Sequence, residues 1–318
     1  MSPLRAAARD SIHGLALGDA FGERWFPLMR TPDEAFAQIQ ARQTPAEPEW
    51  HWTDDTAMAL GLLHALCDHG EIRPDHLAHV FAQTYLADPA RNYGYGMHRL
   101  LPQLAEDPTR WPTAARDLFE GQGSLGNGAA MRTAPLGAWF HDDLDRAAAQ
   151  AVLAARVTHQ HPEGVAGAVA VTVAAALAAA SRGADAPDPA AFLRQTAEPT
   201  PPSLVRDGLL RAAELPADLA PWKAADLLGS GQRIRADDTV PFAVRSAALH
   251  LDSLVDALWS TAEGLGDVDT TCAIAGGIVA ARTGTADLPT DWTARREPLP
   301  AWTDAPDQEA PQRRAPAR

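Results

Sequence analysis

Apolar residues recur at helical spacing along nearly the whole chain, and this periodicity is the feature that most restricts the fold. Leu77, Val80, Phe81 and Tyr85 follow the i, i+3, i+4, i+8 pattern of a single helix face. No short run alternates apolar and polar side chains with the β-branched enrichment that is typical of a strand. The sequence therefore predicts an all-α protein with roughly ten to thirteen helices.

The periodic pattern predicts one helical domain over residues 1–287. From Leu288 onward, Pro, Asp, Arg, Thr and Trp dominate without a period. This composition predicts a Pro-rich, poorly ordered C-terminal tail over residues 288–318, with Trp292 or Trp302 as the side chain that could hold it to the domain.

The charge balance and the apolar stretches exclude several classes of protein. Lys and Arg number 27 against 41 Asp and Glu, so the formal net charge is −14 and a broad nucleic-acid-binding surface is excluded. Residues 164–180 fall short of the roughly 20 strongly apolar residues that span a bilayer, so we expect a buried helix and no membrane contact. Two cysteines are too few for a disulfide framework, which favours a cytoplasmic location. Because no coiled-coil seam is evident, we expect a monomer.

Two clusters of aspartate and threonine stand directly before apolar helical runs. Residues 53–56 are Thr-Asp-Asp-Thr, and residues 266–271, far along the chain, are Gly-Asp-Val-Asp-Thr-Thr. One helix N-cap needs a single such residue, so each cluster exceeds what capping requires. Adjacent carboxylates repel one another, and two such clusters would be costly to bury unless a cation lay between them.

The ligand types in these clusters indicate which cation they suit. Carboxylate and hydroxyl oxygens are preferred by hard cations, and neither cluster contains Cys or His, so Mg²⁺, with Mn²⁺ as an alternative, is favoured over Zn²⁺. The recurrence of the pattern favours a dinuclear site over two unrelated helix caps. Two metal ions can activate a water and hold the oxygens of a polar substrate together. Asp237 is a further candidate for the same acidic site.

Five stretches of the chain carry a resemblance to a known family. They are residues 14–22 (GLALGDAFG), 52–60 (WTDDTAMAL), 126–137 (GNGAAMRTAPLG), 158–163 (THQHPE) and 266–276 (GDVDTTCAIAG). In this order they resemble the motifs of the ADP-ribosylglycohydrolase family, the all-α hydrolases typified by dinitrogenase-reductase-activating glycohydrolase. The resemblance implies one compact domain of orthogonally packed helices. It also implies two bound Mg²⁺ ions and hydrolysis of the bond between ADP-ribose and an acceptor, the substrate being an ADP-ribosylated protein or nucleic acid.

The resemblance assigns roles to both aspartate clusters. Asp54 or Asp55 is expected to orient the attacking water, and carboxylates can offset the oxocarbenium character that develops on the ribose. The implied metal ligands are Thr53, Asp54 and Asp55 for one ion, Asp267 and Thr270 for the other, and Asp269 between the two.

A Gly-rich loop over residues 123–132 opens a helix, so its backbone N–H groups could cradle a phosphate. An ordinary turn is the alternative. The family resemblance favours contact with the diphosphate or ribose and points to Asn127, Gly128, Met131 and Arg132. It also places His159 in the wall beside the substrate.

A second loop, over residues 91–97, is expected to contact the adenine. It contains Tyr93, Gly94, Tyr95 and Gly96, and its two aromatic rings could stack on a base. A plain connection between helices is the alternative interpretation of this loop.

The chain departs from the family pattern at one position. The first motif of the family commonly carries a glutamate seven positions after its aspartate, and counting from Asp19 that position is Phe26. Glu23 lies only four positions on, about one helical turn away, and could take over a catalytic role if the loop path differs. A surface carboxylate beside Arg24 is the alternative.

The displaced glutamate keeps other functions open. One alternative is a catalytically silent ADP-ribose-binding protein. Another is a helical, metal-dependent nucleotide phosphohydrolase, which would cleave the diphosphate instead of releasing intact ADP-ribose.

Overall fold

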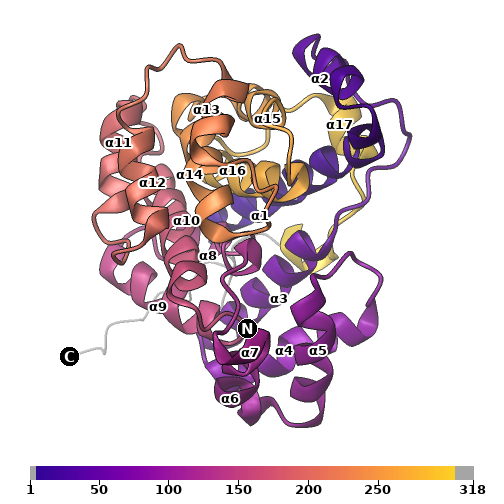
Figure 1. Cartoon of the computed structure of the whole chain (residues 1–318), viewed down its shortest axis with the longest axis vertical. Coiled ribbons are helices and arrows are strands. Elements are labelled where there is room, and N and C mark those ends of the chain that lie inside the picture. Colours follow the sequence, from indigo (N-terminus) through magenta and orange to yellow (C-terminus); the bar gives the residue numbers. More distant parts are fainter. Residues whose placement is uncertain (1–4, 305–318) are drawn as a thin grey trace, which may run out of the picture.

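Helix α1 (Ala6–Glu23) packs along α16 (Val268–Thr283) in the middle of the protein (Figure 1), and glycines set the distance between them. Gly14 lies against Gly276, and Gly18 lies against the backbone of Cys272. Residues four apart share one helix face, so these glycines form a seam that brings the two backbones together. The seam places the start of α16 beside the last turns of α1.

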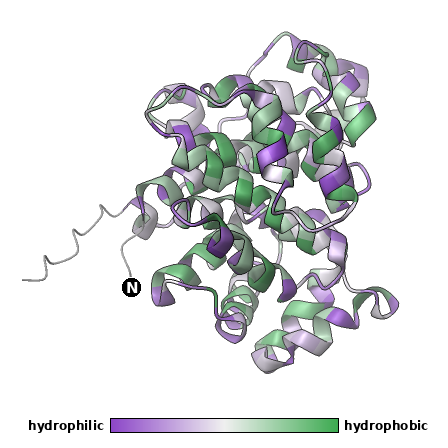
Figure 2. Cartoon of the chain, turned by 90° about the vertical axis from the view of Figure 1, so that its left-hand side faces the viewer, coloured by the Kyte–Doolittle hydropathy of each residue, from purple (hydrophilic) through white to green (hydrophobic). Residues whose placement is uncertain are grey.

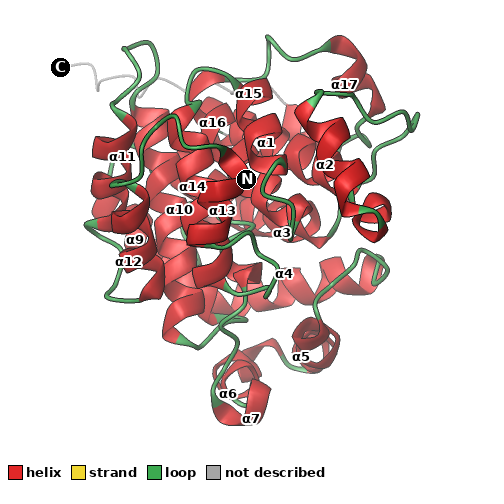
Figure 3. Cartoon of the chain, turned by 45° about the horizontal axis from the view of Figure 1, so that its top comes forward, coloured by secondary structure: helices red, strands yellow, loops and turns green. Residues whose placement is uncertain are grey.

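The computed structural model describes residues 5–304 of the chain, and this part is all-α, without a strand (Figure 3), as the sequence predicts. The described part holds seventeen α-helices, more than predicted, because several are only four to six residues long and too short to show a period. The other α-helices are α2 Pro32–Gln40, α3 Asp54–His69, α4 Pro74–Ala87, α5 Tyr95–Glu106, α6 Trp111–Arg116, α7 Leu118–Gly121, α8 Ala134–Trp139, α9 Leu144–Arg156, α10 Pro162–Ala180, α11 Pro189–Ala197, α12 Leu204–Ala212, α13 Pro221–Leu228, α14 Ala236–Leu249, α15 Leu254–Ala262 and α17 Thr290–Arg295. The 3₁₀ helices are Phe26–Arg30, Pro108–Arg110, Asn127–Ala129 and Ala301–Asp304.

Helix α10 is the apolar helix that the sequence predicts to be buried. It packs against α8, α9, α14 and α16, and hydrophobic residues gather in the interior of the protein (Figure 2). Its length and hydropathy would suffice for a membrane span, but 83% of its most apolar window is buried inside the protein. The small side chains of its Ala and Gly residues allow neighbouring helices to approach it closely.

Helices α3, α4 and α5 lie together below this central group in Figure 1, and α3 contacts α1, α8 and α16. Thr53 is the N-cap of α3, because its hydroxyl accepts a hydrogen bond from the Asp55 amide. Helix α3 ends at His69, and Gly70 caps it in a left-handed backbone conformation. Helix α3 therefore carries the first aspartate cluster into the interior.

The segment from residue 288 to 304 differs from the poorly ordered tail predicted for residues 288–318. It forms helix α17, and Trp292 is buried in a cluster of aromatic rings, stacked on Phe21 at 5.0 Å and tilted against Trp50 at 5.8 Å. Burial of such large rings stabilises the segment despite its Pro-rich composition. The rest of the predicted tail, residues 305–318, lies outside the described residues.

Candidate active site

Helices α3 and α16 begin next to each other, and the carboxylates of both aspartate clusters meet there. Asp19, Asp55 and Asp269 each offer an oxygen within 4.8 Å of the others, and all three are buried. Asp54 and Asp267 lie beside this group, with Asp54 next to Asp55 on α3. The structure thus brings together residues that are far apart in the sequence, as the paired clusters predict.

Asp19 also belongs to this group, although it lies outside the two aspartate clusters that the sequence predicts to form the site. It lies on α1, and its Oδ2 accepts hydrogen bonds from the Thr53 amide at 2.9 Å, the Thr56 amide at 3.0 Å and the Thr56 hydroxyl at 2.6 Å. These bonds fix the start of α3 against α1. A lone aspartate inside the apolar residues 14–22 was the signal that could have found it.

The electrostatics of the cluster are unfavourable without a cation. Burial, and then repulsion from Asp19, raises the pKa of Asp55 well above its usual range, and burial with repulsion from Asp55 does the same for Asp269. Burial raises the pKa of Asp19 to about 6, against its hydrogen bonds from Thr56 and Thr53. Each carboxylate therefore gains from a nearby positive charge.

The donor atoms of the cluster fit a hard cation. Asp55 Oδ1 is buried and has no hydrogen-bond partner among the described residues, while Oδ2 accepts from the Thr53 hydroxyl at 2.9 Å. Asp267 occupies the N-cap position of α16, but its side chain does not cap the helix. Its Oδ2 instead accepts a hydrogen bond from the side-chain amide of Asn127 at 2.6 Å. The buried aspartate group is thus a candidate metal site built from oxygen ligands.

A cavity of about 490 Å³ opens onto the acidic cluster. Most of the predicted site residues line it. These are Asp54, Asp55, Gly94, Tyr95, Gly96, Asn127, Gly128, Met131, Arg132, His159, Asp267, Asp269 and Thr270.

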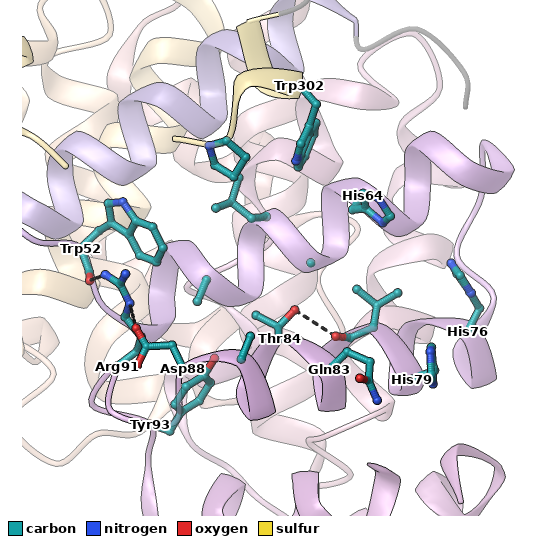
Figure 4. Close-up of a pocket in the computed structure, with 16 residues that line it drawn as sticks. Trp52, His64, His76, His79, Gln83, Thr84, Asp88, Arg91, Tyr93 and Trp302 are labelled. Carbon is teal, nitrogen blue, oxygen red and sulfur yellow. Dashed lines mark hydrogen bonds and ion pairs between the residues drawn. The ribbon is translucent and has the colours of Figure 1, made fainter. Parts of the chain in front are cut away.

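Three predicted site residues lie elsewhere. Tyr93 is buried on the side of a separate cavity of about 570 Å³, between α3 and α4 (Figure 4), so it is not placed to stack on a ligand in the first cavity. Tyr95 keeps that possibility, because it lies at the rim with 72% of its surface exposed. Thr53 and Glu23 border a third cavity of about 470 Å³.

Arg132 is placed differently from the direct diphosphate contact that the sequence predicts. It has no exposed surface, and its guanidinium donates to the Gly128 carbonyl at 3.1 Å, the Ala154 carbonyl at 3.2 Å and the Thr158 hydroxyl at 2.7 Å. The guanidinium also lies over the Phe81 ring at 4.5 Å. Its Nη1 and Nη2 donate to protein oxygens, while its buried Nε has no hydrogen-bond partner among the described residues, so Arg132 supports the Gly-rich loop from beneath.

Arg132 also determines how His159 faces the cavity. An arginine can only donate, so the Thr158 oxygen accepts from Arg132, and the Thr158 proton is available to His159 Nδ1, which lies 2.8 Å away. Donation by Thr158 would place the ring proton on Nε2, which lies beside Gly126 and Gly128. Burial and the Arg132 charge lower the pKa of His159 to about 3, so the ring is a neutral donor.

Two arginines outside the predicted site residues also line the cavity. Arg233 and Arg235 flank Ile234, whose carbonyl accepts a hydrogen bond from the backbone amide of Asn127. Arg235 pairs with Asp237 at 2.9 Å and Arg233 with Asp238 at 2.9 Å. Asp237 therefore pairs with Arg235 and lies outside the acidic group, so the prediction that it belongs to this site is wrong.

Glu23 ends helix α1 beside Asn92, whose amide donates to Glu23 Oε1 at 3.3 Å. Burial raises the pKa of Glu23, with a further contribution from Asp19 and against the effect of Arg24. Asn92 lines both the third cavity and the cavity above the aspartates, so Glu23 stands at the border between the two.

Comparison with known proteins identifies the family. A model of the family described as ADP-ribosylglycohydrolase matches residues 1–314. The chain belongs to the ADP-ribosylglycohydrolase family. This is a family of ADP-ribosyl hydrolases, and its fold is the all-α fold seen here.

Individual members of the ADP-ribosylglycohydrolase family are similar to parts of the chain. It is 33% identical to human ADP-ribosylhydrolase ARH3 over 180 residues, which cover 54% of this chain and 49% of that protein. It is 36% identical to the mouse protein of the same name over 129 residues, covering 40% and 35%. The matched part thus spans half or less of these relatives. A solved structure titled ADP-ribosylglycohydrolase-related protein complex superposes with a TM-score of 0.57 at 24% identity, covering 90% of each chain, which supports the shared fold.

Proposed function

We propose that the protein is a metal-dependent hydrolase that cleaves the glycosidic bond between ADP-ribose and an acceptor. The observation that carries this proposal is the buried, mutually repelling aspartate group at the floor of a ligand-sized cavity. A cavity of about 490 Å³ lies in the range of small-molecule and cofactor sites. Membership of a family of ADP-ribosyl hydrolases supports the same substrate class.

We propose two Mg²⁺ ions, or Mn²⁺, as the cofactors, held by Thr53, Asp54, Asp55, Asp267, Asp269 and Thr270. The unpartnered Asp55 Oδ1 and the raised pKa values of these aspartates fit a site that is completed by cations. When bound, such ions supply positive charge that grips ribose hydroxyls and makes a water more acidic.

The residues around the cavity have distinct tasks in this proposal. Asp54 and Asp55, at the start of α3, orient the attacking water and offset the charge that develops on the anomeric carbon. The neutral His159 presents its Nε2–H to the substrate, and Asn127 keeps the Asp267 carboxylate turned toward the cluster. Glu23 faces the acceptor from the neighbouring cavity.

The diphosphate of ADP-ribose needs local positive charge, because the protein as a whole is acidic. Arg233, Arg235 and the amides of the Gly-rich loop supply such donors at the wall of the cavity. Tyr95 and Phe119 offer exposed aromatic surface at the same cavity for the adenine. We propose that the physiological substrate is an ADP-ribosylated protein or nucleic acid, handled one modified residue at a time by a cytoplasmic monomer.

Product analysis tests the proposal. The protein is incubated with Mg²⁺ and with ADP-ribosylated arginine, serine and nucleic-acid substrates, and the products are identified by mass. Release of intact ADP-ribose is expected, and Asp269→Asn should abolish both turnover and metal binding. Asp10→Asn is the matched control, because Asp10 pairs with Arg182 and does not line the cavity.

Other outcomes would replace the proposal. Release of AMP would indicate a nucleotide phosphohydrolase. Binding of ADP-ribose without any product would indicate a catalytically silent binding protein. Full activity of the Asp269→Asn variant would exclude the aspartate group as the active site.

A further inference from the structure

The short segment that enters the first aspartate cluster is held from two sides. From the interior, Asp19 accepts hydrogen bonds from the amides of Thr53 and Thr56. From the exterior, the Arg91 carbonyl accepts a hydrogen bond from the Asp54 amide at 2.7 Å, and the Arg91 guanidinium donates to the Trp52 carbonyl at 2.8 Å. Both ends of this turn therefore depend on Arg91.

Arg91 is itself fixed by the C-terminal segment. Its Nη1 and Nη2 donate to the two carboxylate oxygens of Glu297 at 2.7 Å each, and the pair is shielded, with 19% and 21% of the side chains exposed. The guanidinium stacks on the Trp52 ring at 3.7 Å, and its Nε pairs with Asp88 (Figure 4). A two-point arginine–carboxylate contact fixes orientation as well as distance.

Glu297 is anchored in turn by backbone pairing. The Glu297 amide donates to the Trp50 carbonyl at 2.9 Å, and the Trp50 amide donates to the Arg295 carbonyl at 2.8 Å. Trp292, which lies about one helical turn before Arg295 in α17, is buried in the aromatic cluster. The segment is thus attached firmly enough to hold Arg91 in place.

From these contacts we infer that Glu297 is a positioning residue for the metal centre: through Arg91 it fixes the backbone of residues 52–54, which carries Asp54 and leads directly into Asp55. The inference rests on the proposed metal site and extends it to a C-terminal segment that contributes no ligand. The hydrogen bonds that Arg91 donates to Glu297 also raise the pKa of Arg91. Residues that orient metal ligands from outside typically change metal affinity by about tenfold to a hundredfold when they are removed.

The test compares Glu297→Gln with Asp10→Asn in the full-length protein. Asp10 forms an ion pair with Arg182 at 2.6 Å and similar exposure, but at the opposite end of α1 from the cluster. Glu297→Gln should weaken Mn²⁺ binding, measured by the free-Mn²⁺ EPR signal, by about tenfold or more. Asp10→Asn should leave it unchanged, although both variants remove a partly buried carboxylate that pairs with an arginine.

A second measurement does not require metal or turnover. Hydrogen exchange of the Asp54 amide in the metal-free protein should accelerate in Glu297→Gln and stay at the wild-type rate in Asp10→Asn, because this amide donates to Arg91. Glu297→Asp, which keeps the charge, should recover part of the protection.

These readouts separate two failures. If the wild type binds Mn²⁺ but hydrolyses no ADP-ribosylated substrate, the proposed function fails while the positioning role stands. If Glu297→Gln keeps wild-type Mn²⁺ affinity and Asp54 protection, or if Asp10→Asn loses both equally, Glu297 has no positioning role.

Discussion

A Cβ atom on Gly22 would lie 2.5 Å from the Cα atom of Asp269. This near contact between α1 and α16 explains how a carboxylate on one helix meets a carboxylate on the other. Asp19 and Gly22 lie about one turn apart, so the helix that carries Asp19 approaches the start of α16 without an intervening side chain. The glycine spacing in residues 14–22 is therefore part of the construction of the aspartate group.

We expect Gly18→Ala to destabilise the protein by about 3 kcal/mol or more, because overpacking at a backbone contact cannot be relieved by a rotamer change. A Cβ at this position would lie 2.1 Å from the Cys272 carbonyl oxygen. Urea unfolding measures the change. Gly94→Ala is the control, since a Cβ there meets nothing within 4 Å. Equal stability of the two variants would contradict the close packing of α1 on α16.

The pKa shifts of the aspartate group predict a pH-dependent response to Mg²⁺. The raised pKa values, about 6 for Asp19 and higher than usual for Asp55 and Asp269, mean that the folded metal-free protein binds protons that the unfolded chain releases. Their contribution to stability is present below the unfolded pKa of about 4 and is lost as the pH rises through the folded values. Mg²⁺ requires the ionised carboxylates, so the increase in Tm that it causes should grow from pH 5 to pH 8.

Calorimetric titration in buffers of different ionisation enthalpy should show protons released as Mg²⁺ binds. The quantity to compare between pH values is the increase in Tm that Mg²⁺ causes. The pKa of His159 is lowered to about 3, so its contribution to the stability of the folded protein is lost as the pH falls. Its effect on Tm is therefore opposite to that of the aspartates. Asp55→Asn should flatten the pH dependence of the increment. An increment that is independent of pH in the wild type would show that the aspartates do not bind the ion.

The chain of hydrogen bonds from Arg132 through Thr158 predicts that His159 is neutral and protonated on Nε2 at neutral pH. Nitrogen-15 NMR of the imidazole distinguishes this tautomer from the Nδ1–H form. Thr158→Val should remove the preference and cost about 1–3 kcal/mol, because it takes away the acceptor of a buried charged donor. Thr172→Val, at another buried threonine of the core, is the comparison for a general loss of stability. A wild-type Nδ1–H signal would contradict the proposed direction of donation.

The sequence allowed the fold class and the convergence of the two aspartate clusters to be predicted, because helical periodicity is local and the clusters stand at helix starts. It did not reveal the place of Asp19, whose importance comes from contacts with Thr53 and Thr56 on another helix. Nor did it show that Arg132 is buried, since a Gly-rich loop with an arginine has the same pattern whether the arginine faces a ligand or the core. Such distinctions depend on tertiary packing.

The C-terminal segment shows the same limit in another form. Its Pro-rich composition predicts little order, yet Trp292 finds an aromatic cluster formed by residues from three distant parts of the chain. The predicted tail is consequently replaced, over residues 288–304, by a segment that contacts the loop before Asp54. Composition reports what a segment can bury by itself, whereas its order here is provided by partners.

Arg233 and Arg235 are expected to contribute to affinity through the diphosphate. The double variant Arg233→Ala and Arg235→Ala should weaken binding of ADP-ribose by about tenfold to a hundredfold. Charge-assisted hydrogen bonds contribute about 1.5–3 kcal/mol each, but both arginines already have an aspartate partner, which reduces what the diphosphate gains from them. Binding of adenosine, which has no phosphate, should change little, and calorimetry measures both ligands. The matched control is Arg206→Ala with Arg211→Ala, two arginines of helix α12 away from the cavity lining. Salt should weaken ADP-ribose binding more in the wild type than in the double variant. An equal loss for adenosine and ADP-ribose would show that these arginines shape the cavity and do not bind the diphosphate.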